Sequence, residues 1–159
     1  MKSSRMRHAL LSVGVLACLV VPARPGKADA PPGRYSITNG GTPTGTVLDT
    51  QTQLTWQQAV PAASYTWANA GSYCTSNMVG LPGVGWRLPT MQELQTIVDD
   101  SQKVAPVIDP TAFPGTPGAV FWTSSAYAPQ AGNAWNVDFS LGTTFHAPAS
   151  TTYTVRCVR

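Results

Sequence analysis

Two stretches in the first half of the chain carry apolar residues at the three- and four-residue spacing of a helix. The first predicts a helix over residues 67–75, with Thr66 as its cap and Cys74 on its buried face. The second begins with a Thr-x-x-Glu capping box at residues 90–93, and its apolar stripe predicts a helix that ends near Asp99.

Alternating apolar and polar residues predict strands on both sides of these helices. A strand over 34–38 is followed by a hairpin whose strands, 45–49 and 54–57, flank a polar turn. Beyond a proline-rich irregular loop, further strands are predicted over 120–124, 134–139 and 153–158. In the second of these, alternation turns Asn136 and Asp138 toward solvent. This order of elements predicts an α+β domain with an antiparallel sheet.

The first 30 residues have the pattern of an export signal. Basic residues precede an apolar run over 9–21, and Ala28-Asp29-Ala30 is a small-x-small cleavage site. Removing this segment changes the net charge from +3 to −1, because it holds five of the ten basic residues and one of the seven acids. We therefore expect a protein that is periplasmic, secreted or on the cell surface.

The remaining 129 residues exclude several classes of protein. The five basic residues are scattered along the sequence and form no basic cluster that could bind a nucleic-acid backbone. The apolar run of the signal is 13 residues long, short of the roughly 18–20 that a membrane span requires, so we expect no transmembrane span. The aromatic content is enough for one buried core. Four tryptophans lie on predicted buried faces: Trp56, Trp67, Trp86 and Trp135.

Cysteine placement indicates one disulfide. Cys18 lies in the signal, where Val15-Leu-Ala-Cys18 resembles a lipoprotein cleavage box, but the apolar run continues past it to Val21, as in an ordinary signal. Cys74 and Cys157 remain, and an oxidising compartment favours their pairing. The alternative is a reactive or metal-binding pair of thiols.

A series of motifs then appears in the order found in one bacterial exported family. The motifs are Val47-Leu-Asp49 with Leu54-x-Trp56, Trp67-x-x-Ala70-x-x-Tyr73-Cys74, Trp86-Arg-Leu-Pro-Thr90-x-x-Glu93-Leu94, Phe113-Pro114, Phe121-Trp-Thr-Ser-Ser125, Ala134-Trp-x-Val-x-Phe139-x-x-Gly142 and Val155-Arg-Cys-Val-Arg159. Over residues 46–159 the chain resembles the Lcl C-terminal-domain family, named for a domain of a bacterial collagen-like adhesin. One departure is Gln53, where the family usually has glycine. The chain thus divides into a signal (1–30), an entry segment (31–45) and this domain.

The resemblance implies a C-type-lectin-like fold. Such a fold has two helices around a twisted antiparallel sheet, adjacent first and last strands, and a long irregular loop region that binds ligand. A bridge between Cys74 and Cys157 is the cross-link that this fold would use. The Arg-Leu-Pro-Thr-x-x-Glu stretch also resembles part of the formylglycine-generating sulfatase-modifying enzymes, whose chemistry depends on redox-active cysteines.

Catalytic and metal-binding signals are sparse. His146 is the one histidine after the signal and has no nucleophile motif beside it, so we expect it at the surface. The clusters of a zinc site are missing. The stretch closest to a calcium-lectin ligand set is Trp135-Asn136-Val137-Asp138, with one residue inserted, so we expect no cofactor, and a calcium site is the alternative. Arg87 and Glu93 are expected to form an ion pair at the capping turn.

Trp122, Tyr127 and Asn133 are the predicted ligand contacts, because exposed aromatic rings stack on sugars while amides bind hydroxyl groups. The alternative is that they pack the loops together. The leading hypothesis is a non-enzymatic, exported binding or adhesion module that recognises a glycan or a surface protein. The family analogy implies sulfated polysaccharides, but the few cations disfavour polyanions unless subunits pool their charge. The alternatives are an enzyme or enzyme accessory and a structural envelope protein; ligand identity and oligomeric state stay open.

Overall fold

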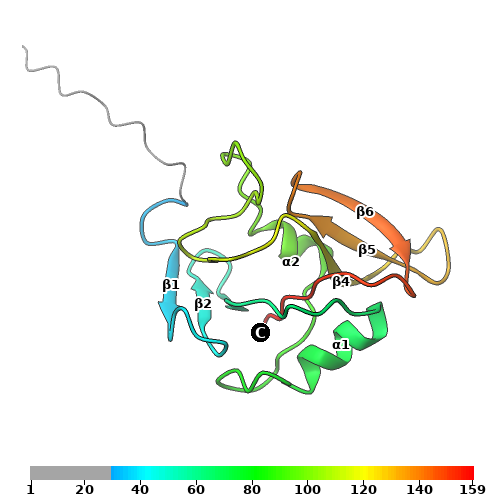
Figure 1. The fold of residues 1–159 in the computed structure, drawn as a ribbon, viewed down its shortest axis with the longest axis horizontal. Helices are drawn as coiled ribbons and strands as arrows, with labels where there is room; N and C mark the ends of the chain where they lie inside the picture. Colours follow the sequence, from blue (N-terminus) through cyan, green and yellow to red (C-terminus); the bar gives the residue numbers. More distant parts are fainter. Residues whose placement is uncertain (1–29) are drawn as a thin grey trace, which may run out of the picture.

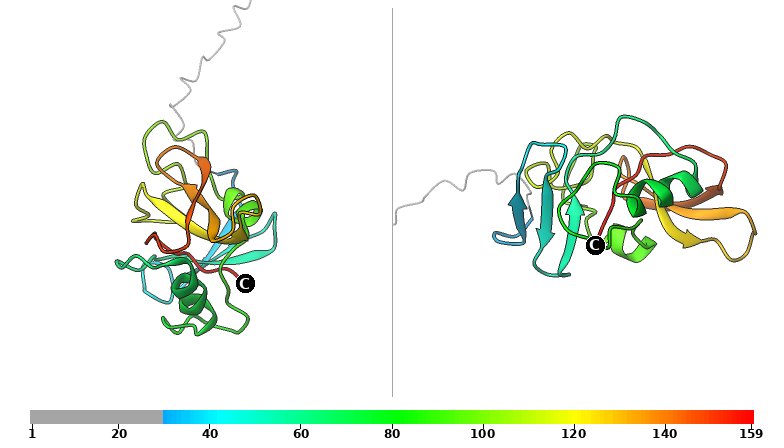
Figure 2. Two further views of the ribbon diagram at one scale, coloured as in Figure 1. Left: turned by 90° about the vertical axis from the view of Figure 1, so that its right-hand side faces the viewer. Right: turned by 90° about the horizontal axis from the view of Figure 1, so that it is seen from below.

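The computed structural model describes residues 30–159 (Figure 1). Its elements are β1 (Tyr35–Thr38), β2 (Thr46–Asp49), β3 (Leu54–Gln57), α1 (Trp67–Thr75), α2 (Met91–Gln95), β4 (Val120–Ala126), β5 (Asn133–Asp138) and β6 (Thr143–Pro148). The α+β class is confirmed. Instead of one sheet there are two three-stranded antiparallel sheets, β1-β2-β3 and β4-β5-β6, at opposite ends of the molecule (Figures 1 and 2). The expected export signal lies outside the described residues except for Ala30.

The first sheet contains the predicted hairpin and the strand before it. β2 and β3 pair from Thr46 with Gln57 to Asp49 with Leu54, and β1 pairs with the other edge of β2. The hairpin turn holds Gln53 at a φ of 61°, a left-handed conformation that favours glycine. This backbone geometry explains why a glycine suits the turn at this position.

The second sheet includes a strand, β6, that the alternation pattern did not predict. β6 pairs along its whole length with β5, and Trp135 lies opposite His146. It is an edge strand on which Phe145 is 48% exposed, so its residues lack a clear buried face. Pairing with β5, rather than its own hydrophobic pattern, defines this strand.

The C-terminal segment, residues 153–158, joins the two sheets but is not the regular strand that we expected. Val158 bridges Trp56 of β3, whereas Thr154 forms a parallel bridge with Phe121 of β4. Figure 1 shows this red segment running between α1 and β4. Because its partners change along its length, it forms isolated bridges and no continuous ladder.

The helices pack on opposite faces of the second sheet. α1 contributes Ala70, Tyr73 and Cys74 to a core cluster that includes Trp122, and α2 contributes Leu94 to the cluster around Phe121. Successive residues of a strand point to opposite faces, so Phe121 and Trp122 mark these two faces. No helix within residues 30–159 is long and apolar enough to cross a membrane.

Both helix starts and the end of α1 at Thr75 lie where the sequence predicts, but the cap of α1 and the end of α2 differ in detail. Thr66 is the N-cap residue of α1, yet its side chain makes no capping hydrogen bond. In α2 both hydrogen bonds of the capping box are present. The helix ends at Gln95 and not near Asp99, because the next amides bond three residues back rather than four, as in a 3₁₀ turn.

The capping box of α2 is tied to the expected ion pair. Both guanidinium nitrogens Nη1 and Nη2 of Arg87 donate to the Glu93 carboxylate, at 2.7 and 2.6 Å, and the Thr90 amide donates to Glu93 Oε2 at 2.8 Å. The hydrogen bonds from Arg87, together with that from Thr90, lower the pKa of Glu93 to about 2.

This lowered pKa predicts an acid-sensitive contribution to stability. The carboxylate stabilises the fold fully above its usual pKa of 4.5, and the contribution is lost as the pH falls toward 2. We expect Glu93→Gln to lower the free energy of unfolding by about 1 kcal/mol at pH 7, and by progressively less toward pH 2. Urea denaturation of both proteins between pH 7 and pH 2.5 measures this, and a pH-independent difference would contradict it.

A disulfide joins α1 to the C-terminal segment. Cys74 and Cys157 are bonded, with their Cα atoms 5.4 Å apart and 83 residues between them in sequence. Both residues are buried. The predicted pairing is therefore confirmed, and it links the middle of the chain to its end.

The charged side chain of Arg156 lies inside the core, with 1% of the residue exposed. Its guanidinium carbon lies 4.5 Å from the centre of the Phe113 ring, and Nη2 donates to Thr116 Oγ1 at 2.7 Å. Nε and Nη1 have no partner within the described residues. Burial lowers the pKa of Arg156 to about 9. Through its contacts with Phe113 and Thr116, the side chain holds the irregular loop against the core. Two of its three guanidinium nitrogens remain buried without a hydrogen-bond partner in the described part of the chain.

We expect Arg156→Met to leave the free energy of unfolding equal to or above that of the natural chain. Methionine fills a similar volume without a buried charge, and such replacements are often neutral or stabilising. Arg156→Ala is the matched control, expected to lose about 2 kcal/mol because it leaves a cavity. Chemical denaturation of both variants measures this. If Arg156→Met lost as much as Arg156→Ala, the charge itself would be required.

Candidate ligand-binding site

Trp122, one of the three predicted ligand contacts, is a core residue. It has no exposed surface, and its ring centre lies 4.8 Å from that of Tyr153. Its Nε1 donates to the carbonyl of Tyr65 at 2.8 Å. The expectation of an exposed ring was wrong, because Trp122 lies on the face of β4 that α1 and the C-terminal segment cover.

Tyr127 and Asn133, the other two predicted contacts, lie side by side. They close the hairpin between β4 and β5, where the Tyr127 amide donates to the Asn133 carbonyl at 2.9 Å. Tyr127 is half-buried, and Asn133 is 9% exposed. The hairpin therefore holds both at one end of the second sheet.

Trp135 and His146 complete a group that the sequence did not predict. The rings of Tyr127 and His146 are stacked, with centres 3.8 Å apart and planes 3° from parallel. Trp135 meets both rings edge-on, 5.0 Å from Tyr127 and 6.1 Å from His146. We call Tyr127, Asn133, Trp135 and His146 the aromatic cluster. Two rings in parallel and one at right angles form a rigid corner.

The four residues meet because of strand pairing. Trp135 on β5 lies opposite His146 on β6, so their side chains share a face. We expected Trp135 to be buried in the core and His146 to be a surface residue; Trp135 is half-buried, and His146 is exposed. A sequence prediction could have placed Trp135 beside His146 only by identifying β6 as a strand that pairs with β5.

A hydrogen bond fixes the His146 ring. Asn133 Nδ2 lies 3.2 Å from His146 Nδ1. With the amide nitrogen as donor, Nδ1 accepts, and the proton of the neutral imidazole is on Nε2. Nε2 then offers an N–H group, and neither a carboxylate nor a hydroxyl group bonds to this ring within residues 30–159.

Several polar groups of the cluster have no protein partner. Trp135 Nε1, Tyr127 Oη and His146 Nε2 make no hydrogen bond in the described part of the chain, and they are not among its buried unpartnered atoms. Water or a ligand is therefore the partner available to them. The cluster combines aromatic surface with uncharged hydrogen-bond donors and acceptors.

The residues nearest to a calcium-lectin pattern do not form an open site. Asn136, expected to face solvent, is 1% exposed, because β5 turns it toward the covered side of the sheet, where it lies opposite Trp122 of β4. Asp138 is half-buried and accepts hydrogen bonds from the Ser140 amide and hydroxyl at 2.7 and 2.6 Å. Residues 30–159 contain no group of three or more His, Cys, Asp or Glu that could hold a metal ion.

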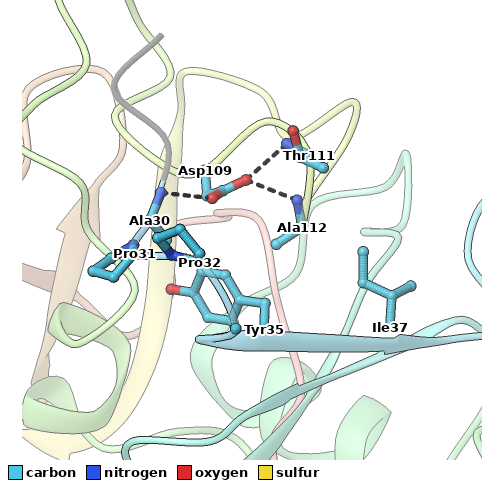
Figure 3. A pocket seen from close by; sticks show the side chains of 9 residues that line it. Ala30, Pro31, Pro32, Tyr35, Ile37, Asp109, Thr111 and Ala112 are labelled. Carbon is cyan, nitrogen blue, oxygen red and sulfur yellow. Dashed lines mark hydrogen bonds between the residues drawn. The ribbon is translucent and has the colours of Figure 1, made fainter. Parts of the chain in front are cut away.

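A pocket of about 170 Å³ lies at the other end of the molecule, against β1 (Figure 3). Asp109 lies beside it with both carboxylate oxygens occupied. Oδ2 accepts from the Ala30 amide at 2.9 Å, and Oδ1 accepts from the amides of Thr111 and Ala112, each at 2.8 Å. The bonds from Thr111 and Ala112 hold the irregular loop, whereas the bond from Ala30 comes from the last residue of the expected export signal.

Comparison with known proteins identifies the family. No curated protein is significantly similar in sequence to the chain. The family model of the Lcl C-terminal domain matches residues 45–159, a range that contains both helices, the disulfide and the aromatic cluster. Because this match covers most of the sequence, the chain belongs to the Lcl C-terminal domain family.

Proposed function

We propose that this protein is an exported, non-enzymatic binding module whose aromatic cluster contacts a glycan. The observation that carries this proposal is the cluster itself. Three rings with incomplete burial are held in fixed orientations, and each has a polar atom without a protein partner. Rigid amphipathic rings give contact area at low entropic cost.

A sugar matches this arrangement better than a protein partner does. The apolar C–H face of a sugar ring packs on an aromatic face, while its hydroxyl groups hydrogen-bond with indole, phenol and imidazole groups. A stable protein interface buries about 800 Å² on each partner, far more than four side chains provide. The small size of the cluster therefore favours one or two sugar rings as the ligand.

We further propose that the fold is C-type-lectin-like. Support comes from the two helices, the antiparallel strands and the disulfide from α1 to the C-terminal segment. The last residues also lie beside the first sheet, where Gln57 donates to the Cys157 carbonyl at 2.9 Å. The disulfide fits export to an oxidising compartment.

The observed disulfide also bears on the enzyme alternative. The sulfatase-modifying enzymes that part of the sequence resembles depend on redox-active cysteines. Cys74 and Cys157 are bonded to each other and buried, so neither offers an accessible thiol. No other observation favours a catalytic reading, and the binding module is the function that we carry forward.

Binding at the aromatic cluster predicts a specific pattern of mutant effects. We expect Trp135→Ala and His146→Ala each to weaken glycan binding at least tenfold, because each removes ring contact and a hydrogen-bonding group, worth about 1.4 kcal/mol or more. Phe145→Ala is the matched control. Phe145 is the exposed neighbour of His146 on β6, points to the opposite face, and should not affect binding.

A glycan array followed by isothermal titration of the hits measures these effects. The proposal fails if the natural protein binds no glycan, with or without calcium. It also fails if Phe145→Ala weakens binding as much as Trp135→Ala does. Circular dichroism of each variant confirms that the loss is not due to unfolding.

A further inference from the structure

We infer that the aromatic cluster selects an uncharged, hydroxyl-bearing sugar and discriminates against sulfated or otherwise anionic glycans. This inference rests on the proposed function and names the chemical class of its ligand. It follows from where the charged side chains lie relative to the cluster.

The strands that form the cluster carry almost no charge. Between residues 110 and 155 the only Asp, Glu, Lys or Arg is Asp138, and residues 50–86, which include α1, have none. Asp138 lies three residues from Trp135 along β5, roughly 10 Å at the rise of a strand. One oxygen of its carboxylate, Oδ1, accepts two hydrogen bonds from Ser140. A ligand on the cluster therefore meets uncharged side chains.

Four of the five cations of residues 30–159 contact a carboxylate or an aromatic ring. Arg34 pairs with Asp49 and Arg87 pairs with Glu93. Arg156 is buried, and the Arg159 guanidinium lies 5.5 Å from the centre of the Trp86 ring.

Lys103, the remaining cation, is exposed in the loop after α2. The neighbouring Asp100 approaches Gly142, at the end of the β5–β6 hairpin opposite to the cluster. Nothing in this distribution brings two free cations to one surface, which a polyanion site requires.

Placing an anion on the cluster would be unfavourable for two reasons. A sulfate or carboxylate would lose hydration without gaining a cationic partner. The face of an aromatic ring is also the negative end of its quadrupole and repels an anion. A neutral hydroxyl group avoids both costs, because it exchanges one hydrogen bond with water for one with Trp135 Nε1, Tyr127 Oη or His146 Nε2.

The test compares neutral and sulfated ligands on the same protein. The natural chain is titrated with neutral tetrasaccharides (one of glucose, one of N-acetylglucosamine) and with a heparin tetrasaccharide, at 50 and 500 mM NaCl, with and without EDTA. The ¹⁵N-labelled indole N–H of Trp135 reports occupancy of the cluster. Trp135→Ala and Phe145→Ala serve as site and control variants.

We expect at least one neutral tetrasaccharide to bind at least tenfold more tightly than heparin, to shift the Trp135 resonance, and to be insensitive to salt and EDTA. Binding of heparin that shifts this resonance and weakens at high salt would overturn the inference and leave the proposed site standing. If no ligand binds, or if Trp135→Ala has no effect on binding, the proposed site itself is wrong.

Discussion

Replacing both Cys74 and Cys157 by alanine is expected to lower the free energy of unfolding by about 4 kcal/mol. The bond closes a span of 83 residues, and a cross-link of that length removes a large amount of conformational entropy from the unfolded chain. It also joins α1 to the segment that connects both sheets, so its loss frees the C-terminal segment from the helix.

Urea denaturation of the oxidised natural chain and of the double variant measures this difference. Under reducing conditions the two proteins should have nearly the same stability, which separates the cross-link from side-chain packing. A loss below about 1 kcal/mol would show that packing alone holds the C-terminal segment in place.

Trp122→Ala is expected to cost about 3–5 kcal/mol, the range for removal of a large buried aromatic side chain. The indole has no exposed surface, packs against Tyr153 and bonds to the Tyr65 carbonyl. Trp135→Ala is the matched comparison. Its side chain is half-buried, so its loss should cost less than half as much stability while abolishing most of the glycan affinity.

Measuring stability and glycan affinity for both variants therefore distinguishes a core tryptophan from a tryptophan in the binding site. Thermal or urea denaturation gives the stability of each variant, and titration with the bound glycan gives its affinity. Equal destabilisation by both substitutions would contradict the assignment of Trp135 to a binding surface. Weakened binding in a stably folded Trp122→Ala protein would show that Trp122 contributes to the site.

The parts of the fold that local sequence signals determine could be predicted. The hairpin of β2 and β3 follows from two short apolar runs around a polar turn, and the start of α2 follows from the spacing of Thr90 and Glu93. Cys74 was expected on the buried face of α1, and it lies there. Each of these features depends on residues within one turn or one hairpin.

The remaining features depend on contacts between distant segments. Residues 153–158 have the alternation of a strand, but their four bridging partners, Trp56, Tyr65, Arg87 and Phe121, are spread along the chain. β6 is specified by its pairing with β5 and not by a clear apolar face. Periodicity contains no information on such pairing, which explains both errors.

The candidate site was likewise predictable only where it depends on local sequence. Tyr127 and Asn133 were predicted from residue type and position near a turn, and they are neighbours in the hairpin. Trp122 has the same residue chemistry but points into the core. His146 joins the cluster only through β6. Residue type identified possible ligand contacts, whereas the topology of the second sheet decides which of them meet.

The central claim is that the corner formed by Tyr127, Trp135 and His146 is where this domain binds its ligand. The most direct test is an NMR titration of the ¹⁵N-labelled natural chain with a neutral tetrasaccharide that binds it. The account predicts that the largest shifts occur at the Trp135 indole N–H and at the backbone amides of Tyr127 and His146. Largest shifts at the Asp109 pocket, with the Trp135 signal unchanged, would contradict it.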